Sequence, residues 1–204
     1  MNSREAYATL RKLGVPVIRT SDAAAALRVS TTAASKTLTQ LARAGLALAL
    51  RPGAFWLNGE VDAYRLPEYL TAPFESYVSL HSALHLRGMV EQIPEVIYAA
   101  SLSRTQRVHT PVAAFSFHHL APEIFGGYEV MPTGAKLATP EKALFDFAYL
   151  SAGRSRLFHA LPELELPRGF RRSELKRWLA KIPAQRSRTV TERKLADFLA
   201  AAVG

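Results

Sequence analysis

The 204-residue sequence contains no cysteine, which excludes disulfide frameworks and thiolate metal sites. It also has no long apolar run, because stretches such as Leu46–Leu50 fall far below the roughly 18 residues that a membrane-spanning helix requires. The first residues are charged and no apolar segment follows them, so no secretory signal is predicted. These absences predict a cytoplasmic protein with no membrane partner.

Short catalytic and phosphate-binding motifs are also missing. The sequence has no G-x-x-x-x-G-K-[ST], G-x-G-x-x-G, H-E-x-x-H or G-x-S-x-G string. His81 and His85 have a helical spacing that lets two imidazoles share a metal, but no third ligand stands at a fixed offset. His118 and His119 are adjacent in an extended segment and must point to opposite faces. We therefore predict a protein that is not an enzyme and holds no cofactor and no metal.

The composition, with 49% hydrophobic and 21% charged residues, is that of a soluble globular chain, and the length favours two small domains. The net charge of +9 is unevenly distributed, with +6 over 1–58, −4 over 59–150 and +7 over 151–204. Two basic ends around an acidic middle predict two surfaces for a polyanion, with nucleic acid as the leading candidate. The alternative is that the basic side chains only solvate helix faces.

Residues 1–58 have the pattern of a winged helix-turn-helix. Ser3 is expected to cap a first helix that Gly14 ends. A second helix spans 20–27, and Ser30 caps a third over 31–43. Small and leucine side chains three or four positions apart predict the buried stripe of this third helix: Ala34, Leu38 and Leu41.

Two short apolar strands, 46–50 and 54–57, follow the third helix and are separated by a turn that begins with Arg51. Hydroxyls, an amide and cations on the outer face of the helix suit base edges in a groove, and a cation at the wing suits the DNA backbone. The side chains expected to face DNA are Thr31, Thr32, Ser35, Lys36, Gln40, Arg43 and Arg51. The alternative is a small helical bundle that makes protein contacts.

The segment 59–72 lacks sustained periodicity and is expected to be a linker. The second domain, 73–204, is expected to open with a helix that contains Tyr77 and Leu84 and ends at Gly88. Short β-type runs predict a small, mainly antiparallel sheet. These runs are 96–100, 112–117 and 128–131.

Helices are expected to complete the second domain. Thr139 is predicted to cap a helix that has a proline and a glutamate in its first turn and runs to about Leu150. Further helices are predicted over 154–161, from Ser173 to the residue before Pro183, and behind a capping box of Thr189 and Glu192. Cations of this region are expected to add DNA contacts: Arg171, Arg172, Lys176 and Arg177. The predicted fold class is α+β, a winged helix-turn-helix followed by a mixed domain with a small antiparallel sheet and C-terminal helices.

Lys142 and Asp146 are four residues apart in the predicted helix that Thr139 caps. Such a pair is ordinarily a solvated salt bridge that contributes about 0.2 to 0.5 kcal/mol, and this is the interpretation we favour. The alternative is that both residues, with Glu141, form an acid and base cluster.

Two strings in the second domain carry a resemblance to a known family. They are Ser-Leu-x-Ser-Ala-Leu at 79–84 and Pro-Glu-Lys-Ala-Leu-x-Asp at 140–146. Together they resemble the C-terminal domain of the AbiEi family of antitoxins, which regulate transcription in type IV toxin-antitoxin and abortive-infection systems. The resemblance covers nearly the whole chain, because that family also carries an N-terminal winged helix.

The resemblance implies an antitoxin that binds inverted repeats in the promoter of its own operon, represses it, and counteracts a nucleotidyltransferase toxin without needing a stable complex. The positions that match the family motifs are implied to carry antitoxin activity: Tyr77, Ser79, Ser82, Glu141, Lys142 and Asp146. Two alternatives remain open at this point. The second domain could be a catalyst that modifies the toxin, or the chain could be a winged-helix repressor that responds to a metabolite.

Overall fold

The computed structural model describes residues 2–57, 59–153, 161 and 163–202. The chain divides into two compact units, one made of Met1–Ala63 with His109–Ala113, the other of Tyr64–Val108 with Ala114–Gly204. The division falls inside the segment that was expected to be a linker. Part of that segment is ordered secondary structure, the short helices η1 (Ala63–Arg65) and α4 (Pro67–Thr71), because Leu66 and Leu70 are buried.

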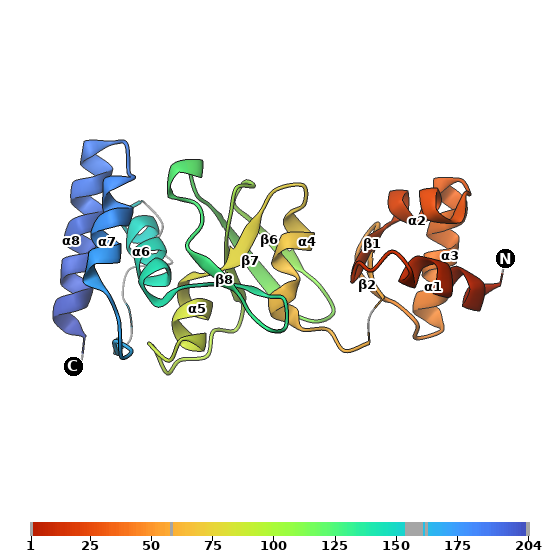
Figure 1. Ribbon diagram of the computed structural model, residues 1–204, viewed down its shortest axis with the longest axis horizontal. Coiled ribbons are helices and arrows are strands. Elements are labelled where there is room, and N and C mark those ends of the chain that lie inside the picture. The colour runs from red at the N-terminus through yellow and green to blue at the C-terminus, as the bar shows by residue number, and fades with distance from the viewer. Residues whose placement is uncertain (1, 58, 154–160, 162, 203–204) are drawn as a thin grey trace. The chain divides into compact units, whose positions relative to one another are not determined.

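Over its described residues the first unit contains the helices α1, α2 and α3, which Figure 1 labels, and an antiparallel sheet of three strands in the order β1-β3-β2. Its elements are α1 (Ser3–Arg11), β1 (Val17–Arg19), α2 (Thr20–Leu27), α3 (Thr31–Arg43), β2 (Leu48–Arg51) and β3 (Ala54–Trp56). The three predicted helices and the two predicted strands are confirmed, whereas β1 was not predicted. Three residues are too few for an alternating pattern to be recognised.

Local hydrogen bonds explain where the helices of this unit begin. The Ser30 hydroxyl accepts a hydrogen bond from the Ala33 amide at 3.2 Å, so the predicted cap of α3 is confirmed. The cap of α1 is Asn2 rather than Ser3, because Asn2 and Glu5 form a reciprocal capping box. The predicted stripe of α3 is fully buried, and it packs on residues of the other elements in one core: Leu10, Ile18, Leu27 and Phe55.

The second unit is built on a six-stranded sheet in the order β6-β7-β5-β4-β9-β8. Its strands are β4 (Ser76–Val78), β5 (Ile97–Ser101), β6 (Gln106–His109), β7 (Ala114–His119), β8 (Tyr128–Val130) and β9 (Lys136–Ala138). Antiparallel pairing joins β4 to β5 and β8 to β9, although β4 and β9 were not predicted as strands. Parallel pairing, which was not predicted, joins β4 to β9 and β5 to β7, so the sheet is mixed.

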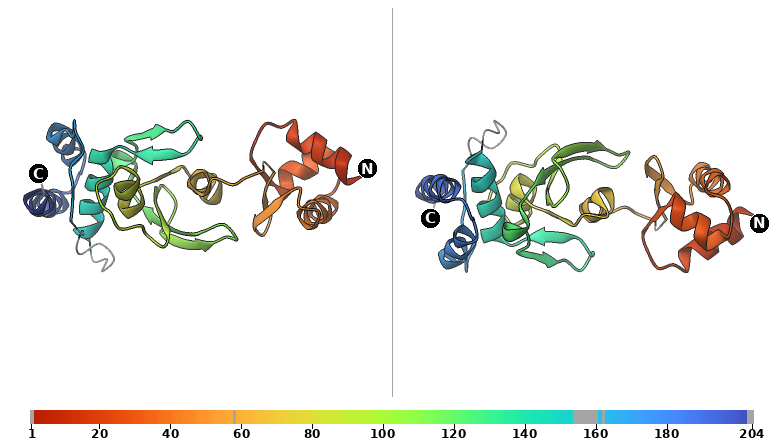
Figure 2. Two further views of the ribbon diagram at one scale, coloured as in Figure 1. Left: turned by 90° about the horizontal axis from the view of Figure 1, so that it is seen from below. Right: turned by 90° about the horizontal axis from the view of Figure 1, so that it is seen from above.

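Helices cover one face of this sheet in two layers (Figure 2). α5 (Leu80–Leu86) and α6 (Pro140–Ser151) lie nearer the strands, and α7 (Arg172–Ala180) and α8 (Gln185–Ala201) pack on α6 from outside. The predicted helix through Tyr77 is wrong in its start, because Tyr77 lies in β4 and the helix begins at Leu80. Along the described stretches of chain, no helix is both long and apolar enough to cross a membrane.

The helices at the C-terminal end follow the predictions in part. Thr139 caps α6, as predicted, by accepting a hydrogen bond from the Lys142 amide. The helix predicted from Ser173 to the residue before Pro183 is confirmed as α7, which begins one residue earlier and ends at Ala180. Leu175 and Leu179 on its inner side are buried. The capping box at Thr189 is wrong, because α8 begins at Gln185 and the Thr189 hydroxyl donates to the Gln185 carbonyl inside the helix. The predicted helix over 154–161 lies, except for its last residue, outside the described residues.

Candidate functional site

The outer face of α3 is an exposed polar surface of the first unit. Its hydroxyls, amide and cations are all exposed: Thr31, Thr32, Ser35, Lys36, Gln40 and Arg43. Ala34, Leu38 and Leu41 on the opposite side are completely buried. The hydrophobic side therefore holds α3 in the core and leaves the polar side open to a partner.

The other predicted DNA contacts lie at two places. Arg51 is half-buried at the end of β2, where the turn of the predicted wing begins. In the second unit four cations on or next to α7 are exposed: Arg171, Arg172, Lys176 and Arg177. Arg177 forms an exposed ion pair with Glu174 at 3.0 Å, which reduces its availability to a phosphate.

A buried polar cluster lies between α6 and the sheet of the second unit. Lys142 Nζ forms an ion pair with Asp146 Oδ1, and both side chains are 0% exposed. The same ammonium donates to the Ile124 carbonyl at 2.7 Å. The expectation of a solvated salt bridge is therefore wrong, because the pair forms at the predicted spacing but on the face of α6 that the rest of the unit covers.

Two hydroxyls from the segment before α5 also donate hydrogen bonds to the Asp146 carboxylate. Tyr77 donates to Asp146 Oδ2 at 2.9 Å, and Ser79 donates to the same oxygen at 2.7 Å. These bonds span 69 and 67 residues of sequence. With Lys142 on the other oxygen, Asp146 has three protein donors, which a buried carboxylate requires if it is to remain ionised.

Aromatic rings surround the buried ammonium. Lys142 Nζ lies 4.3 Å from the ring centre of Trp178 and 4.8 Å from that of Phe145. These distances are within the range of cation–π attraction, which strengthens when the cation is removed from water. Lys181 contacts the Trp178 ring as well, at 3.9 Å. Trp178 thereby couples α7 to the polar cluster.

The burial of the cluster shifts the pKa of each of its acids and bases towards the neutral form. Desolvation lowers the pKa of Lys142 and raises the pKa of Asp146, while each partner favours the charge of the other. Burial, with Asp146 nearby, raises the pKa of Tyr77 well above its ordinary value. Tyr77 therefore stays protonated and serves as a donor.

Two further residues that the family motifs selected lie next to the cluster but outside its hydrogen bonds. The buried Glu141 carboxylate accepts from the Arg171 amide at 2.8 Å and so holds the start of α7. Ser82 accepts from the Tyr98 amide at 2.9 Å and holds α5 to β5. The structure thus brings together Tyr77, Ser79, Lys142 and Asp146, and places Glu141 and Ser82 in supporting contacts.

Backbone strain marks the same place. Leu80, which is completely buried, has a φ of 56°, in the left-handed region. Such a conformation costs a non-glycine residue on the order of 1–2 kcal/mol. The neighbouring Ser79 is fixed by its hydroxyl on Asp146 and by its amide on the Tyr98 carbonyl. These bonds hold the chain in the conformation that directs the Ser79 hydroxyl at the carboxylate.

Gly127 provides a test of how tightly the cluster is packed. It has a φ of 75°, and a Cβ added there would lie 2.5 Å from Trp178 Cζ2 and 3.0 Å from Lys142 Cγ. Alanine at this position would suffer both the steric overlap and the cost of a left-handed φ. We therefore expect Gly127→Ala to lower the unfolding free energy of the second unit by about 2–4 kcal/mol. In Gly126→Ala, where nothing lies within 4 Å, only strain acts and we expect about 1–2 kcal/mol. Equal losses in urea denaturation would contradict this packing.

His118 makes the stability of the second unit dependent on pH. The side chain is 5% exposed, and burial, with Arg107 and His81, lowers its pKa from 6.5 to about 4. The unfolded chain therefore binds more protons between these values, so stability falls as the pH decreases through that window, by about 3 kcal/mol in all. Urea denaturation between pH 7 and pH 4 should show this loss reduced in His118→Gln and retained in His119→Gln, a control at an exposed position of the same strand. A His118→Gln variant with the full loss would contradict the assignment.

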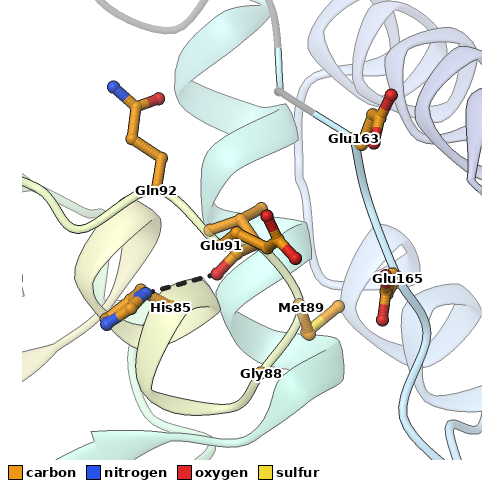
Figure 3. Close-up of a pocket in the computed structure, with 8 residues that line it drawn as sticks. His85, Gly88, Met89, Glu91, Gln92, Glu163 and Glu165 are labelled. Carbon is orange, nitrogen blue, oxygen red and sulfur yellow. Dashed lines mark hydrogen bonds between the residues drawn. The ribbon is translucent and has the colours of Figure 1, made fainter.

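One cavity of the second unit has a volume of about 810 Å³ (Figure 3). It is lined by His85 and the loop after α5 on one side and by the segment with Glu163 and Glu165 on the other. His85 Nδ1 lies 3.3 Å from the Val90 carbonyl, so that nitrogen is engaged within its own loop. In the described part of the chain no group of three or more metal-ligating side chains is assembled.

Sequence reasoning missed the residues that enclose the polar cluster. Trp178 and Gly127, which pack against Lys142, were not among the predicted site residues. The indication in the sequence was the pair Gly126-Gly127 directly before the strand at Tyr128, because a glycine beside a strand often marks a place where another group approaches the backbone closely.

No protein-family model matches this chain, and no curated protein matches its sequence.

Proposed function

We propose that the chain is a cytoplasmic DNA-binding autorepressor and antitoxin of a type IV toxin-antitoxin operon. In this proposal the first unit is a winged helix-turn-helix, α2 and α3 are its two helices, and the turn between β2 and β3 is its wing. It binds inverted repeats in the promoter of its own operon. The second unit counteracts a nucleotidyltransferase toxin.

The exposed polar face of α3 is the observation that carries the DNA-binding part. Hydroxyl and amide groups on that face suit base edges in the major groove, and Lys36 and Arg43 suit phosphates. The apolar side of the helix is fully buried, so this face is directed outwards by the packing of the unit. The net charge of +6 over residues 1–58, which make up most of this unit, supports a polyanionic partner.

The antitoxin part rests on the family resemblance, and the structure refines how its residues would act. All six motif positions are at most 5% exposed: Tyr77, Ser79, Ser82, Glu141, Lys142 and Asp146. A side chain at such a position does not contact a partner in the folded protein. We infer that these residues hold α5, α6 and α7 together, and that the toxin is counteracted by the surface which they support.

The same burial weighs against the alternative of a catalyst that uses Glu141, Lys142 and Asp146. A general acid or base must reach the proton that it transfers, within about 3 Å of the substrate atom, and these side chains are covered on all sides. Incubation of the protein with toxin and nucleotide, followed by mass spectrometry of the toxin, tests this alternative directly. A mass change that requires Lys142 in a folded variant would favour it.

The salt dependence of DNA binding tests the proposed interface. If about six phosphates are neutralised by the two basic surfaces, log affinity should fall with log salt concentration at a slope of about −5. The measurement is fluorescence anisotropy of a labelled fragment of the operon's own promoter, with an unrelated fragment of equal length as the control. A slope close to zero would contradict electrostatic binding, and equal affinity for both fragments would contradict the role of a specific repressor.

A further inference from the structure

A second cavity, of about 480 Å³, opens beside the β6 edge of the second unit's sheet. Its walls come from α5, the loop before β5, β5 itself and β6, and they include His81, Tyr98 and Arg107. Its volume lies within the range of small-molecule sites. None of its lining residues belongs to the α3 face or to the buried polar cluster.

The sheet register places a polar stripe beneath this cavity. In the parallel pair of β5 and β7, Tyr98 is opposite Ser116 and Ala100 is opposite His118. Alternate residues of a strand point to the same face, so Tyr98, Ser116 and His118 share one face. The rings of Tyr98 and His118 stack with centres 6.0 Å apart, and the Ser116 hydroxyl lies 2.9 Å from His118 Nε2.

α5 adds a second imidazole to this stripe. The His81 ring lies 5.1 Å from the Tyr98 ring and meets Phe147 of α6 edge-on at 4.8 Å. Arg107, whose side chain is exposed on β6, contributes a permanent positive charge. Besides burial, Arg107 and His81 both lower the pKa of His118, which places each of them within electrostatic reach of that imidazole.

We propose that this cavity binds a small anion carried on a flat ring, either an aromatic carboxylate or a nucleoside monophosphate. Arg107 would bind the carboxylate or phosphate, because its guanidinium presents a fork of donors that matches both groups. The Tyr98 ring would contact the flat body, and apolar side chains such as Val90 and Val96 line the remaining wall. Glu95 is the one carboxylate among the described lining residues, and its negative charge disfavours the binding of an anion.

The experiment is a titration of the full chain with small-molecule probes, monitored by NMR through the ring C–H signals of His81, His118 and Tyr98. The probes are benzoate and adenosine monophosphate, with benzamide and adenosine as uncharged counterparts, each up to about 10 mM because ligands of this size bind weakly. We expect saturable shifts with one or both anions, and at least tenfold weaker binding of the uncharged counterparts. The anion that binds identifies the group that the site prefers.

Variants make the outcome specific to the cavity. Arg107→Gln should weaken binding at least tenfold and Glu95→Gln should strengthen it severalfold, while Arg104→Gln, an exposed cation outside the lining residues, should leave it unchanged. Arg107→Gln should also raise the pKa of His118 without any ligand, since Arg107 lowers it. The proposal is overturned if neither anion shifts these rings, if the uncharged probes bind equally well, or if Arg107→Gln changes neither binding nor the pKa of His118.

Discussion

Replacing Lys142 with methionine is expected to lower the unfolding free energy of the second unit by about 3–5 kcal/mol, because the substitution leaves the buried carboxylate of Asp146 without its counter-charge. Tyr77 and Ser79 still donate to Asp146, but two neutral donors do not balance a full charge in a dry site. Methionine fills the space of the lysine side chain as far as Cε and lacks only the ammonium position, so little of the loss comes from an empty space.

Two comparisons identify the unpaired charge as the cause. Lys142→Met combined with Asp146→Asn removes both charges and retains an acceptor for the two hydroxyls, so it should be more stable than Lys142→Met by about 2 kcal/mol. Lys176→Met, the same change at an exposed position of α7, should alter stability by less than about 0.5 kcal/mol.

The loss in Lys142→Met should also shrink at acidic pH. Burial already raises the pKa of Asp146, and removal of Lys142 raises it further, because the attraction that favoured the charged form is gone. Protonation then relieves the unpaired charge as the pH falls. Fluorine NMR of 5-fluorotryptophan protein in urea follows each unit separately, since Trp56 lies in the first and Trp178 in the second. A loss below about 1 kcal/mol, or one that grows with acid, would contradict a buried ion pair.

The elements that the sequence predicted well are those with strong local determinants. Thr139 and Ser30 each accept a hydrogen bond from an amide three residues ahead, and that interaction is encoded within one turn. The strands β4, β6 and β9 have only three or four residues each, and they form because of their neighbours in the sheet. The parallel pairing of β4 with β9 joins residues about 60 positions apart, so a local pattern does not contain it.

The polar cluster shows the same limit in the candidate site. A lysine four residues before an aspartate predicts that the two will meet, and they do. Whether water reaches them depends on Tyr77, Ser79 and Trp178, which come from elements distant in sequence. The cavity beside β6 likewise depends on the register of β5 against β7, which brings Tyr98 and His118 to one face. The spacing of two residues in the sequence therefore indicates whether they can pair, whereas tertiary packing determines whether the pair is buried or exposed to water.

Reversing two charges on α3 is expected to abolish specific DNA binding while the protein stays folded. Lys36 and Arg43 are exposed, so Lys36→Glu with Arg43→Glu leaves the buried stripe of the helix intact. Each reversal removes an attraction to the phosphates and adds a repulsion, about 2 kcal/mol per position, so affinity for the promoter fragment should fall by about a thousandfold. The slope of log affinity against log salt should become shallower by about 2.

The matched control is Lys12→Glu with Arg4→Glu, which makes the same change in net charge on an exposed part of the same unit. If long-range charge alone determined binding, both pairs of reversals would weaken it equally, whereas an interface on α3 predicts that the control retains most of the affinity. Toxin neutralisation should survive in both variants, because it is assigned to the second unit. Equal losses of DNA binding in the two variants would remove α3 as the interface, and a simultaneous loss of neutralisation would contradict the separation of the two activities between the units.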